Sequence, residues 1–257
     1  MKLIQSRDNP FYKELAKLAV SARQRNKTKQ TLLDGMHLLE AYLDVGGMPQ
    51  HILLNAAALQ NHEIVTLLDR LDCVPLTQLD NKLFAELSEL NTLTGILALI
   101  DSPSGSVATE SCFSLLLEGI QDPGNLGSMI RSAAAAGCDA VYLSKGCADV
   151  WSPKVLRAAM GGHFALKIFD NQDLYNISKT FSGTLLATSP QAATSLYNCD
   201  LSGNVALLIG NEGAGLSTGL IDMATQKINI PMSGRVESLN VAAATAICLF
   251  EVVRQRN

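Results

Sequence analysis

Short apolar segments alternate with amphipathic ones along the whole chain, and this alternation constrains the fold more than any other feature of the sequence. Short apolar runs bounded by Gly, Pro or polar residues are typical of buried strands, while apolar residues three and four positions apart are typical of helices. Repeated strand–helix pairs predict a largely parallel sheet with helices on both faces. The predicted fold class is therefore α/β.

The first hundred or so residues predict one small α/β unit. Its predicted strands are 31–33, 51–54, 73–74 and 95–100, and its predicted helices are 8–24, 36–45, 56–70 and 82–90. A stretch rich in Ser, Pro and Gly, 101–106, follows the last strand and is typical of a linker. We therefore expect a domain over residues 1–101, a linker over 102–111 and a second domain over 112–257.

The second half repeats the alternation over a longer stretch. Its predicted strands are 113–118, 140–143, 166–168, 184–187, 205–209 and 227–230, and its predicted helices are 125–136, 154–160, 173–179 and 238–254. In an open parallel sheet, ligands bind beyond the carboxyl ends of the strands. The loops that follow the strands of this half are therefore the first place to look for a site.

The composition excludes several classes of protein. Of the 257 residues, 47% are hydrophobic and 17% are charged, which is enough apolar material for two cores. No apolar run is long enough to span a membrane, and the N-terminus lacks the apolar core of a signal peptide, so we expect a cytoplasmic protein without membrane contact. The six cysteines are scattered without a C-x-x-C pair or nearby histidines, which favours free thiols over a metal site.

Charge is distributed unevenly along the chain. Residues 1–30 carry eight basic and two acidic side chains, whereas the whole chain has a net charge of −4. A basic segment on an acidic body can attract phosphate groups. An ordinary solvated helix face explains the same pattern equally well at this stage.

The first loop of interest, 118–124, leads into the helix predicted from 125. Leu126, Met129, Ile130 and Ala133 repeat at helical spacing and face the core, which places Arg131 on the polar face. Asn125 lies in the first turn, after an entry rich in Pro and Gly. Arg131 is therefore either a candidate functional residue or a plain surface arginine.

The second loop, 210–216, follows a strongly apolar strand. Its three glycines allow a ligand to approach the backbone closely, or simply permit a tight turn. Leu216 stands where a phosphate-binding loop needs its lysine, and the glycine spacing is not G-x-G-x-x-G. Glu212 is a carboxylate in this loop that needs a partner.

The third loop, 230–240, leads into a final helix that is apolar on most sides and should be buried. Ser238 is predicted as the N-cap of that helix, and Asn240 as a polar residue of its first turn. Taken alone, neither residue requires a function.

In combination the three loops resemble the signature motifs of the SpoU family of RNA ribose methyltransferases, in the SPOUT superfamily. The matching segments are Asp122-Pro123-Gly124-Asn125-Leu126-Gly127-x-x-Ile130-Arg131-Ser132-Ala133, Gly210-Asn211-Glu212-Gly213-x-Gly215, and Ile230-Pro231-Met232-x-Gly234-x-x-x-Ser238-Leu239-Asn240-Val241-Ala242. The resemblance covers about residues 113–257. The N-terminal half is similar, more weakly, to the family's small α/β substrate-binding domain, with Asp34-Gly35 where the family usually carries Glu-Gly.

The resemblance implies a fold and a chemistry that periodicity does not reveal. It implies a C-terminal SPOUT domain with a deep trefoil knot, and S-adenosyl-L-methionine as the methyl donor. By their match to the motifs, the donor-binding residues would be Gly210, Ile230 and Leu239, joined by Thr188 and Met232. The catalytic residues would be Asn125, Arg131, Glu212, Ser238 and Asn240. No metal is implied.

The resemblance also implies partners: an RNA substrate and a second copy of the chain, because family members are commonly homodimers. The family's arginine has been assigned as a base, but a guanidinium rarely releases a proton, so binding the adjacent phosphate is equally consistent for Arg131. Ribosomal RNA of the 23S type is preferred over transfer RNA because of the N-terminal domain. Two rivals are a nucleotide-dependent enzyme using the 210–215 turn, which fails the motif tests, and a non-catalytic RNA-binding or resistance protein that kept the fold.

Overall fold

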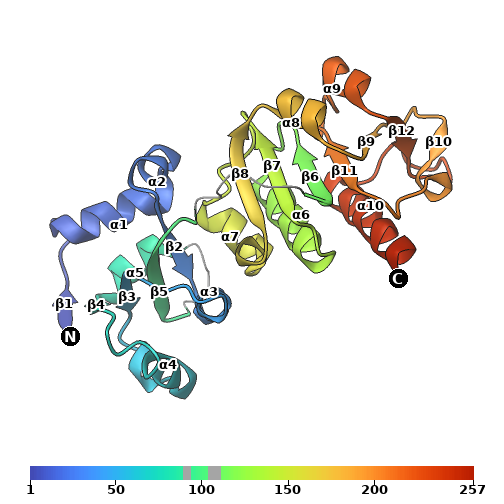
Figure 1. Cartoon of the computed structure of the whole chain (residues 1–257). Helices are drawn as coiled ribbons and strands as arrows, with labels where there is room; N and C mark the ends of the chain where they lie inside the picture. The colour runs from blue at the N-terminus through green and yellow to red at the C-terminus, as the bar shows by residue number, and fades with distance from the viewer. Residues whose placement is uncertain (89–93, 104–110) are drawn as a thin grey trace. The chain divides into compact units, whose positions relative to one another are not determined.

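The computed structural model describes residues 1–88, 94–103 and 111–257 and divides the chain into two compact units. The first unit comprises Met1–Pro103 together with Trp151–Gly161, and the second comprises Ser104–Val150 together with Gly162–Asn257. Figure 1 labels the elements of both units. Most of the predicted linker, 102–111, and the last two residues of the helix predicted over 82–90 lie outside the described residues.

The first unit contains a five-stranded sheet in the order β1-β4-β3-β5-β2. Strand β5 runs antiparallel to its neighbours β2 and β3, and the other pairs are parallel. The elements are β1 (Lys2–Ile4), α1 (Pro10–Val20), α2 (Ala22–Thr28), β2 (Gln30–Asp34), α3 (Met36–Asp44), β3 (His51–Leu54), the short 3-10 helix η1 (Ala58–Gln60), α4 (His62–Leu68), β4 (Leu76–Leu79), α5 (Asn81–Leu87), β5 (Ile96–Asp101) and α7 (Pro153–Ala159).

Three predictions for this unit were wrong in detail. The helix predicted over 8–24 is two helices, since Ser21 leaves the helical conformation and caps α2 by accepting from the backbone N–H of Gln24. The strand predicted at 73–74 is absent, and β4 lies just after Pro75. The helix predicted from residue 56 begins only at His62, where Asn61 caps α4.

Helix α7 packs with the first unit although it lies far along the chain. It contacts β2, and the Thr31 hydroxyl donates a hydrogen bond of 2.7 Å to the carbonyl oxygen of Trp151. Gly161, at φ +87°, ends this segment against Ala41, where a side chain would overlap the Ala41 methyl group. Sequence periodicity predicted the helix itself but gave no indication of these partners.

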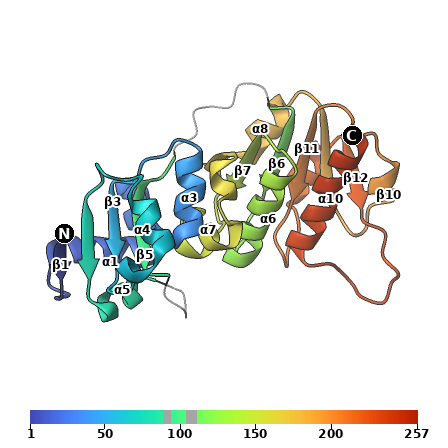
Figure 2. The same cartoon turned by 90° about the horizontal axis from the view of Figure 1, so that it is seen from below.

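The second unit contains a seven-stranded parallel sheet in the order β10-β12-β9-β11-β6-β7-β8, as the prediction of a largely parallel sheet requires. Its elements are β6 (Phe113–Leu117), α6 (Pro123–Ala135), β7 (Ala140–Ser144), η2 (Gly162–Phe164), β8 (Lys167–Gln172), α8 (Leu174–Thr180), β9 (Thr184–Thr188), β10 (Thr194–Ser195), η3 (Leu196–Asn198), β11 (Val205–Ile209), α9 (Thr218–Met223), β12 (Gln226–Asn229) and α10 (Val241–Arg256). Figures 1 and 2 both show α6 and α10 side by side, in agreement with their direct contact.

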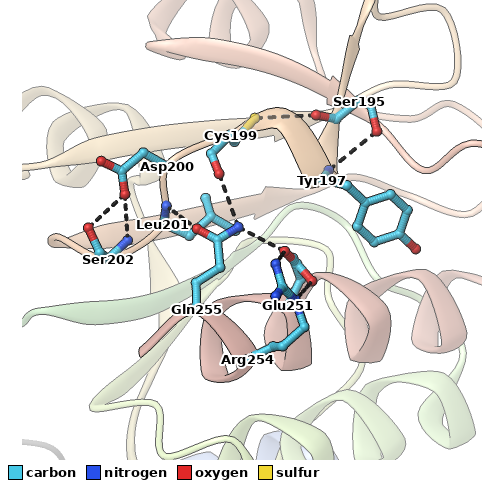
Figure 3. Close-up of polar contacts among 9 residues, drawn as sticks. All are labelled: Ser195, Tyr197, Cys199, Asp200, Leu201, Ser202, Glu251, Arg254 and Gln255. Atoms are coloured by element: carbon cyan, nitrogen blue, oxygen red, sulfur yellow. Dashed lines mark hydrogen bonds and ion pairs between the residues drawn. The ribbon is translucent and has the colours of Figure 1, made fainter. Parts of the chain in front are cut away.

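A network of polar contacts fastens the C-terminal end of α10 to the chain between β10 and β11 (Figure 3). The Gln255 amide accepts from the backbone N–H of Leu201 at 2.9 Å and donates to the carbonyl oxygen of Cys199 at 3.0 Å. Glu251, only 6% exposed, accepts hydrogen bonds from both Arg254 and Gln255. The helix that begins at the third motif is therefore anchored at its far end. Within the described residues, no helix is long and apolar enough to cross a membrane.

Candidate active site

Three of the residues predicted to bind the methyl donor lie at the same edge of the second sheet. Thr188 ends β9, Gly210 follows β11 and Ile230 follows β12, and these strands are neighbours in the order β12-β9-β11. The strands are parallel, so their carboxyl ends meet at one edge. Thr188 is fixed there by donating its hydroxyl to the carbonyl oxygen of Leu208 at 3.2 Å.

Gly210 begins a loop that folds back on itself. The backbones of Asn211 and Gly215 exchange hydrogen bonds of 3.1 and 3.0 Å, and the Asn211 side chain accepts from the N–H groups of Gly213 and Ala214. A Cβ at Gly210 would overlap the backbone of Gly215 and Leu216. Asn211 was not among the predicted site residues, although an asparagine two residues before a glycine is a common signal for a side-chain-supported turn.

The first and second motifs are joined through Glu212. Its carboxylate accepts from the Asn125 amide at 3.2 Å and lies 3.4 Å from the backbone nitrogen of Asp122. A second link runs from the Asn211 amide to the carbonyl oxygen of Gly119 at 2.7 Å. The carboxylate for which the sequence showed no partner is therefore held by donors from the loop that precedes α6 and from the first turn of that helix.

These contacts set the ionisation of Glu212. Partial burial opposes the charged form, but hydrogen bonds from its own backbone, the Asn125 amide and the N–H groups of Gln121 and Asp122 outweigh that effect and lower the pKa of Glu212. The residue is therefore an anion at neutral pH. An anion that accepts several hydrogen bonds is suited to hold a loop in place rather than to carry protons.

The third motif joins the same cluster through Asn240, which donates from its amide to Asn125 Oδ1 at 2.9 Å. Asn240 is also the N-cap of α10, because its Oδ1 accepts from the backbone N–H groups of Ala242 and Ala243. The prediction that Ser238 caps this helix was wrong, since the N-cap lies two residues later, at Asn240. Asp122 caps α6 in the same way, by accepting from the N–H of Asn125 at 2.7 Å.

Arg131 lies on the exposed side of α6, as helical periodicity predicted. Leu126, Met129 and Ile130 on the other side are fully buried. Among the described residues, none forms a hydrogen bond or ion pair with the Arg131 side chain. Its guanidinium group is therefore available to an anionic ligand.

The remaining predicted residues, Met232, Ser238 and Leu239, lie in the segment 231–239 between β12 and α10. Every residue of this segment is exposed, including the apolar side chains of Met232 (38%) and Leu239 (37%). Among the described residues, no hydrogen bond or ion pair joins the side chains of these three residues to the Asn125–Glu212–Asn240 cluster. Of the five predicted catalytic residues, three are thus joined by hydrogen bonds. The other two, Arg131 and Ser238, have no such link to them within the described part of the chain.

The strand-end loops fit an adenosyl donor in their chemistry. Gly210 keeps the end of β11 free of a side chain, and Ile230, Met232 and Leu239 supply apolar surface within one sheet edge and the segment that follows it. An adenosyl group is flat and apolar on its faces and offers polar atoms that backbone groups recognise. Within the described part of the chain, no group of His, Cys, Asp or Glu is arranged to hold a metal ion.

Comparison with known proteins identifies the family. Residues 113–250 match the model of the SpoU rRNA Methylase family, and residues 9–98 match that of the MRM3-like substrate binding domain. The chain belongs to the SpoU rRNA Methylase family. The resemblance drawn from the three motifs is thereby confirmed, as is that of the N-terminal half.

Similarity to individual proteins extends over nearly the whole chain. The 23S rRNA (guanosine(2553)-2′-O)-methyltransferase RlmP of Bacillus subtilis is 34% identical over 254 residues, covering 98% of this chain and 99% of that protein. A crystal structure of an RNA 2′-O ribose methyltransferase superposes with a TM-score of 0.85 at 30% identity, with 99% of each chain covered. An AdoMet-bound rRNA methyltransferase from Sinorhizobium meliloti gives 0.85 at 26% identity, with 98% of this chain and 97% of that one covered.

Proposed function

We propose that this chain methylates a ribose 2′-hydroxyl of ribosomal RNA, with S-adenosyl-L-methionine as the donor. The observation that carries the proposal is the hydrogen-bonded cluster of Asn125, Glu212 and Asn240, which joins all three motifs beside the strand-end loops. Relatives that share both domains are named as RNA 2′-O-methyltransferases. A nucleotide-dependent enzyme built on the 210–215 turn has no comparable support.

The chain's own residues have two tasks in this reaction. When bound, the donor supplies an electrophilic methyl carbon, so the protein must position the ribose oxygen in line with it. Thr188, Gly210 and Ile230 form the donor site with Met232 and Leu239. Asn125 and Asn240 orient the polar groups beside it, and Glu212 holds the N-terminal end of α6, which carries Asn125.

Arg131 binds the phosphate next to the target ribose in this proposal. A guanidinium remains charged at every accessible pH and matches phosphate oxygens with two parallel donors. The hydroxyl proton then leaves to that phosphate or to water. Ser238, exposed in the segment before Asn240, contacts the donor or the RNA.

The first unit would capture RNA through α2. Arg23, Lys27 and Lys29 are exposed there, whereas Arg25 is buried and donates to the carbonyl oxygens of Leu18 and Ala19. Three exposed cations remain for phosphate contacts. The three exposed side chains are therefore proposed to contact RNA, whereas Arg25 has a structural role in the basic N-terminal segment.

A homodimer formed by the second units completes the proposal. Ala243 and Phe250 are exposed on one side of α10, Ile247 lies half-buried between them, and Phe250 is 47% exposed. Such an apolar stripe is typical of an interface. Light scattering should give twice the 27.5 kDa mass of one chain.

Two further features follow from the family. A deep trefoil knot would involve the C-terminal chain, supported by the position of β11 between β6 and β9 and by the return of α10 to α6. A cytoplasmic location would match a ribosomal RNA substrate.

Methyl transfer from labelled S-adenosyl-L-methionine tests the function directly. We expect label in ribosomal RNA and not in transfer RNA, with the modified position resistant to alkaline cleavage at its 3′ side because the 2′-oxygen is blocked. The Asn125→Ala variant, which removes the central amide of the cluster, is the matched negative control. Label in transfer RNA alone would show that transfer RNA is the substrate. Donor binding without label in any RNA would favour a non-catalytic RNA-binding protein that kept the fold.

A further inference from the structure

A surface cavity of about 500 Å³ lies in the second unit, beside the loop that follows β6. Its walls come from the carboxyl ends of β6, β7 and β8 and from the helices α8 and α9, which contact each other. Figure 1 shows these two helices together at the top of the unit. None of the residues assigned above to the donor or to catalysis lines this cavity.

The cavity offers an apolar base and an aromatic side chain. Leu174 and Leu220 are buried, and Tyr175 is 47% exposed. The Tyr175 hydroxyl lies against Gly219 of α9, where any Cβ would overlap it. Gly219 therefore allows the tyrosine to lie across the helix. A cavity of this size with an exposed aromatic side chain suits a flat ring, which can stack on it.

Apart from the ammonium group of Lys145, which donates, the polar side chains of the wall are mainly hydrogen-bond acceptors. Glu118 accepts from the backbone N–H of Ser217 at 2.7 Å through one oxygen, and its other oxygen has no partner among the described residues. Asn171 and Gln172 direct their amide nitrogens to Asp170, at 3.0 and 2.8 Å, which leaves their carbonyl oxygens to accept. A ligand for this wall must therefore offer several donors, and it can also present an acceptor to Lys145.

We propose that this cavity binds an unstacked guanine base of the substrate RNA, outside the nucleotide that is methylated. The inference rests on the proposed function. Guanine presents adjacent N–H donors, N1–H and the 2-amino group, which the two oxygens of Glu118 can accept together, since the oxygen bonded to Ser217 keeps a second lone pair. Uracil presents one such donor between two acceptors. The ring would stack on Tyr175.

The position of the cavity makes such a base a specificity element. Gly119 forms part of its wall, receives a hydrogen bond from Asn211 at its carbonyl oxygen, and donates at 3.0 Å to Ser144, which also lines the cavity. The same loop continues to Asp122 and Asn125. A bound base therefore rests against the loop that positions Asn125.

A titration followed by methyl NMR tests the proposal with guanosine 5′-monophosphate as the probe. The protein carries labelled leucine methyl groups and saturating S-adenosylhomocysteine, which fills the donor site. We expect shifts at Leu174 and Leu220, and binding at least about fivefold tighter than for uridine 5′-monophosphate. Tyr175→Ala should weaken binding about fivefold or more, whereas Tyr175→Phe, which keeps the ring, should bind like the unmodified protein. Tyr197→Ala, at a tyrosine of similar exposure outside the cavity, is the control.

The RNA trinucleotide ApGpA then separates an RNA base from a free nucleotide. Shifts at the same leucines that disappear in Tyr175→Ala support the proposal. Shifts with the mononucleotide but not with the trinucleotide would overturn it in favour of a free-nucleotide site. Equal binding of all four mononucleotides, or no effect of Tyr175→Ala, would also overturn it. If S-adenosylhomocysteine itself fails to bind, the proposed function is at fault rather than this inference.

Discussion

Asn240 donates a hydrogen bond of 2.9 Å to Asn125, from the N-cap of one helix to the first turn of another, across 115 positions of the chain. The two helices are themselves in contact. One side chain thus begins α10 and sets the orientation of the Asn125 amide, which in turn donates to Glu212. The start of a helix and the geometry of the candidate site depend on the same residue.

Two substitutions of Asn240 separate these tasks. Asn240→Asp keeps an oxygen that accepts from Ala242 and Ala243 but loses the amide that donates to Asn125. We expect near-normal thermal stability with methyl transfer reduced by about 10-fold or more, because catalysis depends on orientation. Asn240→Ala should also lose about 1 kcal/mol of stability with the cap. Full activity of the aspartate variant in a single-turnover assay would contradict a positioning role.

The loop after β11 predicts opposite outcomes for two glycines three residues apart. Gly210→Ala places a methyl group into the backbone of Gly215 and Leu216, so the loop must open and donor binding should be lost. Gly213→Ala meets only Asn211 Oδ1, at an ordinary 3.6 Å, and should bind the donor normally. Calorimetry with S-adenosylhomocysteine checks both variants. Normal binding of S-adenosylhomocysteine by Gly210→Ala would contradict the assignment of this loop to the donor site.

The hydrogen bonds around Glu251 at the C-terminal end of α10 predict that the stability of the protein decreases in acid. Hydrogen bonding from Arg254, opposed by burial and helped by Gln255, lowers the pKa of Glu251 to about 2. In the unfolded chain an ordinary glutamate has a pKa of about 4.3. The contribution of Glu251 to stability is therefore complete above that pH and is lost as the pH falls toward about 2. Glu251→Gln should be less stable than the unmodified protein at neutral pH, and the difference in free energy of unfolding between the two should shrink as the pH falls. Glu237→Gln, at an exposed site, should show no such dependence on pH. Urea unfolding at several pH values measures this.

The buried strands were predictable from sequence because both of their faces are covered. Val205–Ile209 is entirely buried and reads as an unbroken apolar run, and its predicted bounds are confirmed. By contrast, β1 was missed because Lys2–Ile4 is an edge strand with one buried residue, and α9 was missed because a helix of six residues shows little periodicity. Strong burial leaves a sequence signal, and edges and short elements do not.

The candidate site was predictable as residue identities but not as contacts. Motif resemblance selected Asn125, Glu212 and Asn240, yet no local pattern shows that they bond to one another, because each link joins residues about a third of the chain or more apart. The same limit hid the contact between Thr31 and Trp151. Helical geometry did place Arg131 correctly, since the side of a helix depends only on neighbouring residues.

The first unit predicts a salt-dependent test of RNA capture. Replacing Arg23, Lys27 and Lys29 with alanine should weaken RNA binding and lower the slope of log affinity against log salt by up to about one per lost phosphate contact. The control replaces Lys167, Lys179 and Lys227, exposed lysines of the second unit. Arg25 is left intact because its buried guanidinium caps α1, so its loss would reduce stability instead. An unchanged salt slope in the α2 variant would make this segment an ordinary solvated face.

Arg131 gives the sharpest test of chemistry, because its exposed position on α6 makes the fold insensitive to its replacement. Arg131→Ala should leave thermal stability and S-adenosylhomocysteine affinity nearly unchanged while lowering methyl transfer on the order of 100-fold or more. Lys179→Ala, at an exposed cation of the same unit, should retain activity.

Arg131→Lys then separates the two possible roles of Arg131, as a base and as a phosphate-binding residue. Lysine keeps the charge and releases a proton more easily, so a base role predicts partial rescue that grows with pH. A phosphate-binding role predicts poor rescue at every pH together with weaker RNA binding, since lysine lacks the planar pair of donors. Single-turnover rates across pH, measured beside RNA affinity, decide between them, and near-normal activity of Arg131→Ala would end both assignments.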